Sequence, residues 1–377
     1  MSSKKNINRT SYWPVVAALV AAAAGQWCFR VAMAEWAAFG GTAAGLRAAT
    51  GWMDREAAHW CRLAEAEERD EAALGALRRC TAANPSWGMA WTSQGMLEDA
   101  MGRNGEGALL EGARRNRRYG AYRAASDHYF GRGEWGKFEE WAWGAMEMGT
   151  RAERIELLEM LLGTPGGAQR DLVRAAKGSP STLAAVLELA MGRGWDDTAH
   201  TCAKLLTAVE WAWIRGQFEE WILGRGRGDL LGGEGRIQNE TFVPWPGGKG
   251  WDWRIVGGEG VETGPGEAGG VRIVLTGQQA ESVPILWAYV DLRGERTLET
   301  TASAGGLEGD SGLRWRLEDV KTGRVVWEGA EDLRGSQTVK IETKQWAGTG
   351  RLVFGYRRKK GTIRSKGEIV LKRVWLR

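Results

Sequence analysis

Cysteine and histidine, which often catalyse reactions or bind metals, are few in this chain: Cys28, Cys61, Cys80, Cys202, His59, His128 and His200. The cysteines have neither the C-x-x-C spacing of a zinc or redox site nor the pattern of a disulfide framework. Cys61 and Cys80 could face each other on neighbouring helices, but we expect two independently buried thiols, because free cysteine is among the most buried residue types. Because the histidines are scattered as well, we expect no metal site and no cofactor.

Sequence motifs of known catalytic sites are absent from the 377 residues. There is no Walker loop, G-x-S-x-G, H-E-x-x-H or cysteine–histidine pairing, and no acidic pair stands apart from the solvated charge of helices. A formal G-x-G-x-x-G at 264–269 contains Pro265 and leads into a strand, so it does not predict a phosphate-binding loop. We therefore expect a protein that is not an enzyme, although glycosidase carboxylates carry no motif and leave that class open.

Aromatic and basic residues in two predicted loops suggest the binding of sugars. Trp245 lies between two prolines, where its ring could stack on the apolar face of a pyranose. The predicted tip of a hairpin supplies four cations: Arg357, Arg358, Lys359 and Lys360. This basic tip is either a solvated turn or a contact for an acidic polysaccharide or anionic headgroups. Trp245 and the basic tip are therefore the candidate glycan contacts.

The first element along the chain is an uncharged apolar stretch at 12–29. Its 18 residues, at about 1.5 Å per residue, form a helix of roughly 27 Å, close to the thickness of the hydrocarbon core of a bilayer. Lys4, Lys5 and Arg9 precede it, and positive residues favour the cytoplasmic side. We expect a cytoplasmic tail at 1–11, with everything after the stretch exported.

Three interpretations of this stretch remain open. We favour a transmembrane anchor at 12–34, on grounds of its length and lack of charge. The sequence Ala32-Met33-Ala34 also fits a signal-peptidase site, which would release the protein. A soluble buried helix is the third interpretation, because the stretch is rich in alanine.

A helical repeat is predicted in the segment 35–223. Trp60, Trp91 and Tyr122 are spaced by 31 residues, and each lies near the start of an amphipathic helix. A fixed period of this length is typical of a solenoid, whose units stack on their neighbours. We expect the aromatic and glycine positions to pack helix against helix: Trp60, Trp91, Gly95, Tyr122, Tyr129, Gly133 and Trp135.

These repeat positions resemble the tetratricopeptide pattern. In that pattern a large residue opens the first helix of each pair, a small residue permits close approach of the second, and a turn glycine ends the first helix. The resemblance implies that any binding groove is lined by the remaining faces of the first helices.

Beyond a glycine-rich linker at 224–235, the apolar period changes from that of a helix to that of a strand. Nine segments alternate or are β-branched, which is enough for two packed antiparallel sheets in a β-sandwich at 236–377. We expect Trp253, Trp287 and Trp315 to fill its core. The nine segments are 251–255, 271–276, 285–292, 296–303, 313–320, 324–329, 338–343, 351–357 and 368–376.

Several phrases of this last region resemble the jelly-roll domain that ends some bacterial membrane-anchored tetratricopeptide proteins. They are RIQNETF at 236–242, GWDWRI at 250–255, SGLRWRL at 311–317 and IVLKRVWL at 369–376. The resemblance implies a carbohydrate-binding-like fold and a role in export or assembly of envelope polysaccharide. The family opens the domain with Asn-Gly-Asp-Phe, whereas this chain has Asn239-Glu240-Thr241-Phe242, which removes an aspartate that could hold calcium.

Together these features predict a non-enzymatic scaffold that spans the bacterial inner membrane once, with its N-terminus cytoplasmic and its repeats and sandwich periplasmic. Its expected partners are proteins bound by the repeats, the membrane bound by the N-terminal helix, and polysaccharide. The net charge of +4 is too small to predict a nucleic-acid partner. The alternatives are a glycan-binding module with the repeats as a stalk, or an accessory to a carbohydrate-active enzyme.

Overall fold

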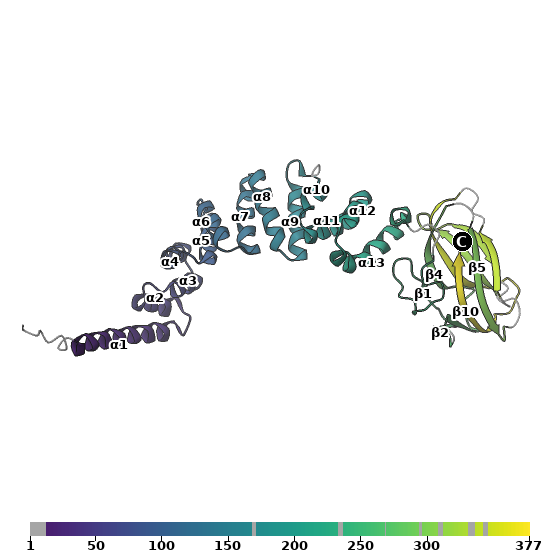
Figure 1. Cartoon of the computed structure of the whole chain (residues 1–377), viewed down its shortest axis with the longest axis horizontal. Helices are drawn as coiled ribbons and strands as arrows, with labels where there is room; N and C mark the ends of the chain where they lie inside the picture. Colours follow the sequence, from purple (N-terminus) through teal and green to yellow (C-terminus); the bar gives the residue numbers. More distant parts are fainter. Residues whose placement is uncertain are drawn as a thin grey trace, which may run out of the picture. The chain divides into compact units, whose positions relative to one another are not determined.

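The computed structural model describes residues 13–167, 171–232, 237–267, 269–293, 296–307, 312–330, 336–341 and 346–377. The chain forms two compact units, one ending at Asp171 and the other beginning at Leu172. The first unit is helical, and the second combines helices with strands (Figure 1). The predicted cytoplasmic tail at 1–11 lies outside the described residues.

The helices of the first unit follow one another with short connections. They are α1 (Trp13–Ala38), α2 (Ala43–Trp52), α3 (Ala57–Ala66), α4 (Asp70–Ala83), α5 (Gly88–Ala100), α6 (Glu106–Arg115), α7 (Tyr119–Arg132), α8 (Trp135–Met148) and α9 (Arg151–Gly163). Consecutive helices pack in pairs, α3 with α4, α5 with α6 and α7 with α8.

Helix α1 contains the one segment, among the described residues, that is long and apolar enough to cross a membrane, Val15–Ala38. Its side chains from Val15 to Phe29 are exposed. Its last turns instead bury Ala34 and Ala38 in a core shared with α2 and α3. The Arg30 guanidinium donates from Nε to the carbonyl of Trp52 at 2.9 Å, so the first charge after the apolar stretch is held by α2.

The 31-residue period corresponds to one pair of helices. Trp60, Trp91 and Tyr122 are each the fourth residue of their helix, α3, α5 and α7. The Trp60 indole donates to the carbonyl of Asp54 at 2.7 Å, and the Trp91 indole donates to that of Pro85 at 2.9 Å. Each tryptophan thus ties its helix to the turn that precedes it, six residues back.

Tyr122 has no indole N–H and packs sideways instead. Its ring lies 5.2 Å from that of Trp141 in α8, and Gly144 of the same helix leaves room for it. A Cβ at Gly144 would lie 2.7 Å from the Tyr122 ring, so a larger residue would force α8 away from α7. The helices of the third pair, α7 and α8, therefore contact each other through the Tyr122 ring and Gly144.

Two of the predicted glycines have different structural roles. One lets two helices approach closely, and the other ends a helix. A Cβ at Gly95 would lie 2.6 Å from Cγ of Leu109, so only glycine lets α5 approach α6 this closely. Gly133 ends α7 with a φ of +71°, a conformation that glycine adopts without strain. Trp135 then begins α8 and packs its ring 5.6 Å from that of Phe130.

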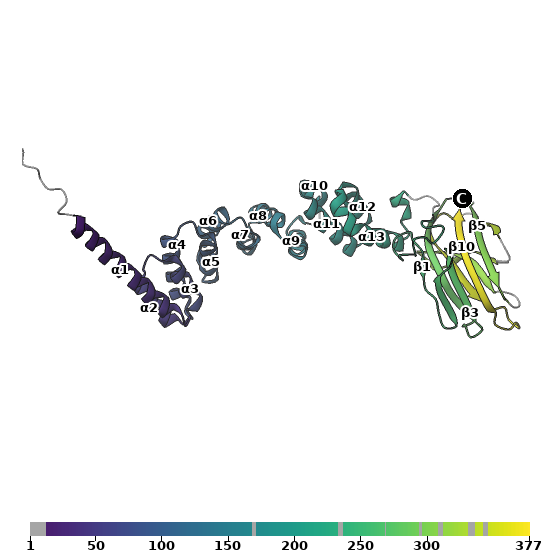
Figure 2. The same cartoon turned by 60° about the horizontal axis from the view of Figure 1, so that its bottom comes forward.

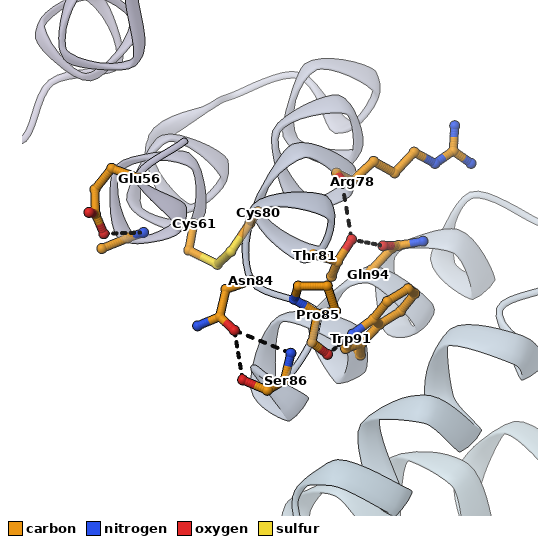
Figure 3. The surroundings of a disulfide bond; sticks show 11 residues. Glu56, Cys61, Arg78, Cys80, Thr81, Asn84, Pro85, Ser86, Trp91 and Gln94 are labelled. Atoms are coloured by element: carbon orange, nitrogen blue, oxygen red, sulfur yellow. Dashed lines mark hydrogen bonds between the residues drawn. A yellow bond between two sulfur atoms is a disulfide. The ribbon is translucent and has the colours of Figure 1, made fainter. Parts of the chain in front are cut away.

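Cys61 and Cys80 form a disulfide that joins α3 to α4 (Figure 3). The expectation of two independent thiols was wrong. The two residues lie on facing sides of consecutive helices, with Cα atoms 5.4 Å apart, which is within the separation that a disulfide spans. Of the other two cysteines, Cys28 is exposed and Cys202 is buried.

The second unit begins with four helices and a short 3-10 turn. These are α10 (Leu172–Ala176), α11 (Pro180–Arg193), α12 (Asp196–Leu205), α13 (Ala208–Gly224) and η3 (Gly228–Leu231). Among the described residues, ten strands follow: β1 (Arg254–Ile255), β2 (Val261–Pro265), β3 (Val271–Thr276), β4 (Ser282–Leu292), β5 (Arg296–Gly305), β6 (Leu313–Asp319), β7 (Val325–Ala330), β8 (Ser336–Ile341), β9 (Gly348–Arg357) and β10 (Lys366–Leu376).

The strands form two antiparallel sheets that enclose an apolar core. One sheet has the order β1-β4-β9-β6-β7 and the other the order β2-β3-β10-β5-β8. Figure 2 shows β3, β10 and β5 of the second sheet side by side. Trp253, Trp315 and Phe354 are fully buried between the sheets, in contact through their rings. Burial of Trp253 and Trp315 was predicted correctly.

Trp287, predicted to lie in the core, is half-buried on the outer face of its sheet. A bulge between Pro284 and Leu286 turns two successive residues inward, so that the side chain of Trp287 points out. The Arg254 guanidinium covers its ring, 4.3 Å from the centroid. Beyond the bulge, Leu286 and Ala288 face the core on either side of Trp287.

The segment predicted as a linker at 224–235 packs on the sandwich over the part that is described. Gly228 in η3 is buried and donates its N–H to Oγ1 of Thr349 in β9 at 2.7 Å. Glu220 of α13 accepts from the guanidinium of Arg254 in β1. The last helices and the sandwich therefore form one unit.

Candidate functional site

A groove runs between the first helices of two neighbouring pairs, α5 and α7. Its volume is about 430 Å³. The side chains that give it chemical character are Met96, Asp99, Arg103, Asp127, His128 and Arg132. Its lining comes from both helices and from the turn that follows α5.

A polar pair lines the groove: His128, whose side chain is buried, and Asp99, which is partly exposed. Nδ1 of His128 lies 2.5 Å from Oδ2 of Asp99, and the other oxygen of Asp99 accepts the N–H of Gly105 at 3.0 Å. Nε2 of His128 lies 3.4 Å from the guanidinium of Arg132 at the rim. These contacts fix α5, α7 and the turn before α6 relative to one another.

The rim of the groove combines an apolar side chain with charges of both signs. Met96 is 56% exposed, which is high for a methionine in a folded helical unit. Arg103 pairs with Glu71, and Asp127 accepts from Arg123 at 2.8 Å. Flexible methionine together with paired charges suits an extended or helical segment of another protein.

A hydrogen-bonded cluster joins α7 to the neighbouring helices α6 and α8. The hydroxyl of Tyr129, in α7, donates to Glu106 of α6 at 2.8 Å, and Lys137 of α8 reaches the same carboxylate at 3.2 Å. Burial, with a lesser contribution from Glu106, raises the pKa of Tyr129 to about 12. Hydrogen bonds from Tyr129 and then Lys137 lower the pKa of Glu106 below its ordinary value. Both groups thus keep the protonation that the cluster needs at neutral pH.

A larger cavity, of about 600 Å³, lies within the second unit. Helices α12 and α13 form one side, and η3 and Trp251 form the other. Its main polar and aromatic lining residues are His200, Lys204, Trp211, Arg215, Phe218 and Trp251. Sequence reasoning did not single out this set, because its members lie on two helices and a turn, as much as 51 residues apart.

The predicted glycan contacts are accessible but differ in their partners. Trp245 is 42% exposed. Arg357 contacts Glu328 at 3.4 Å, and Arg358 pairs with Glu281 at 2.6 Å. Lys359 and Lys360, also exposed, complete the basic tip.

The structure does not bring Trp245 and the basic tip together. The loop that contains Trp245 lies close to Gly269, just before β3. This proximity is seen at Val243, whose side chain would be 3.3 Å from a Cβ placed on Gly269. Arg358 pairs with Glu281, beyond the other end of β3. The six residues of β3 span roughly 20 Å. A single sugar cannot contact both.

Among the described residues, no group of three or more histidine, cysteine, aspartate or glutamate side chains is placed to hold a metal ion. The chain matches no protein-family model and no curated protein.

Proposed function

We propose that the protein is a non-enzymatic scaffold anchored in the bacterial inner membrane, which binds another protein in the groove between α5 and α7 on the periplasmic side. The observation that carries this proposal is the groove itself. It presents an exposed methionine and charges of both signs, and the His128–Asp99 pair orders its lining before a partner arrives. A preordered surface loses less entropy on binding.

Two features of the first unit support export of the helices. The exposed apolar side chains from Val15 to Phe29 suit a lipid environment, and Lys4, Lys5 and Arg9 favour a cytoplasmic N-terminus. The Cys61–Cys80 disulfide suits an oxidising compartment, because cytosolic thiols are kept reduced. The lipid-facing helix and the disulfide thus favour the same orientation.

The packing of α1 favours an anchor over a cleaved signal. Ala34 is fully buried against α2 and α3, within a helix that continues to Ala38. Cleavage after Ala34 would remove it from that core together with Arg30, which holds the end of α2. The cleaved chain would therefore expose apolar surface.

The role in envelope polysaccharide assembly rests on the resemblance of the C-terminal sequence to jelly-roll domains. Strand order supports this part of the proposal. Without the short edge strands β1 and β2, the sheets read β3-β10-β5-β8 and β4-β9-β6-β7, an arrangement of eight strands in two sheets that jelly rolls share. The α5–α7 groove then recruits a protein of the assembly machinery.

Chemical cross-linking of intact membranes, followed by purification of the full chain, tests the proposal. Arg132→Glu reverses a charge at the rim of the groove, whereas Arg114→Glu reverses an exposed charge on α6 outside it. We expect the protein that co-purifies with the wild type to be lost from the first variant and kept by the second. Equal recovery with both variants would contradict a role of the groove.

Glycan binding is a second candidate function, favoured by the exposed Trp245. A stacked aromatic typically contributes about 1–3 kcal/mol, judged from rings that bind bases. Trp245→Ala should then weaken binding of envelope polysaccharide by the full chain at an unchanged melting temperature, as titration calorimetry measures. Undiminished binding would remove Trp245 from the site.

A further inference from the structure

We infer that the cavity between α12, α13, η3 and Trp251 binds a saccharide that carries a carboxylate. The site is separate from the α5–α7 groove, so either can fail without the other. It is also separate from Trp245, which does not line it. The inference rests on the apolar walls, the cations and the hydrogen-bonding groups that meet there.

One wall of the cavity is aromatic. Trp211 is half-buried and lines the cavity, with its ring 5.6 Å from the ring of Phe218. Phe218, Ile237 and Trp251 are buried and form an apolar floor. A flat ring over an apolar floor suits a pyranose, whose axial C–H groups form an apolar face. A small inorganic anion would gain nothing from these walls.

Two cationic side chains, Lys204 and Arg215, line the same cavity. Lys204 is exposed on α12, and among the described residues no carboxylate forms an ion pair with it. Arg215 of α13 pairs with Glu219 at 2.7 Å and still leaves its two terminal nitrogens to bind. Because Glu219 offsets the charge of Arg215, Lys204 is the cation that favours an anionic ligand over a neutral sugar, and Arg215 adds N–H donors for a carboxylate.

His200 also lines the cavity. Burial, and then the charges of Lys204 and Arg227, lower its pKa despite the opposing Asp197 and Asp229. The imidazole is therefore neutral at pH 7 and can form a hydrogen bond with a sugar hydroxyl.

The cavity also contains hydrogen-bonding groups, which a sugar needs for its hydroxyls. Glu219 and Gln238 both line the cavity and offer acceptor oxygens, which a plain carboxylate cannot use but ring hydroxyls can. The volume of about 600 Å³ falls in the range of small-molecule sites. An acidic sugar uses the aromatic wall, the cations and the acceptors at once.

Saturation-transfer NMR on the full chain in detergent, with glucuronic acid, glucose and acetate as probes, tests the inference. We expect glucuronic acid to bind at least about tenfold more tightly than either of the others, because only it has both a carboxylate and a pyranose ring. Its affinity should fall as salt rises. Equal binding of acetate, equal binding of glucose, or no binding of glucuronic acid would each overturn the inference.

Matched variants locate the site. Lys204→Gln changes an exposed residue and should weaken glucuronic acid binding and its salt dependence, whereas Lys359→Gln on the basic tip should change neither. Trp211→Ala should weaken binding about tenfold or more, and Trp245→Ala should leave it unchanged. If Lys204→Gln has no effect, or if Trp245→Ala has the effect expected of Trp211→Ala, the cavity is not the site.

Discussion

Tyr129 belongs to a hydrogen-bonded cluster that links three helices of the first unit. Its hydroxyl joins α7 to Glu106 of α6, and Lys137 of α8 binds the same carboxylate while covering the Tyr129 ring. Tyr129→Phe keeps the ring and removes the hydrogen bond. We expect a loss of about 1–2 kcal/mol in the free energy of unfolding at pH 7.

This loss should depend on pH in one direction. The pKa of Glu106 is lower in the folded chain than its ordinary value of 4.5, so its contacts stabilise the fold above that pH and cease to do so as pH falls through the folded-state pKa. The difference between wild type and Tyr129→Phe should therefore shrink between pH 5 and pH 3. Denaturant titrations at the two pH values measure it, and a difference that does not change with pH would contradict the Tyr129–Glu106 contact.

Some contacts between individual residues could not be predicted from the sequence. The period of 31 located the helices that line the groove, yet His128 and Asp99 are 29 residues apart and nothing local pairs them. The cavity of the second unit likewise brings Lys204 to Trp251 only through the packing of α12, α13 and η3. Such sites arise from tertiary packing, which one sequence does not reveal.

At the scale of elements, the close approach of α5 and α6 is a testable feature. Gly95→Ala would place a methyl group 2.6 Å from Cγ and 2.8 Å from the backbone N of Leu109. The overpacking should cost about 1–3 kcal/mol of stability. Gly75→Ala is the matched control, because this glycine lies within α4 with nothing near its Cβ position and should gain about 0.5–1 kcal/mol.

Thermal melting of the two variants separates a packing role of Gly95 from a general preference for alanine in helices. Stabilisation by both substitutions would show that α5 and α6 do not approach as described.

The strands show which elements the sequence predicts well. All nine predicted segments contain strand residues, because alternation and β-branching give a clear local signal. Strand β2, with the sequence V-E-T-G-P, was not predicted, since its glycine and proline are typical of a turn. Strand β1 keeps only Arg254 and Ile255 of its predicted five residues and pairs at an edge. Edges and bulges depend on neighbours more than on local sequence.

At the scale of the whole molecule, the unit boundary differs from the expected linker. The glycines of 224–235 suggested a break, but Gly228 lets η3 pack directly on Thr349 and Trp251. Glycine permits close packing as readily as it permits flexibility, and composition alone does not separate the two. The last helices thus belong with the sandwich.

Export of both units is testable in cells. A phosphatase reporter fused after Arg377 should be active, and carbonate extraction should leave the protein in the membrane. The Cys61–Cys80 pair should resist alkylation until a reductant is added, because the disulfide protects both thiols. An inactive reporter with freely alkylated cysteines would place the helices in the cytoplasm.

The central claim is that a protein occupies the groove between α5 and α7, and site-specific photocross-linking tests it most directly. A benzoylphenylalanine in place of Met96 stands at the rim of the groove, and one in place of Arg114 stands on the exposed face of α6. Irradiation of living cells should give one discrete cross-linked protein from the Met96 position, lost when Arg132→Glu is added, and none from the Arg114 position. Identical cross-links from both positions, or none from Met96, would contradict the account.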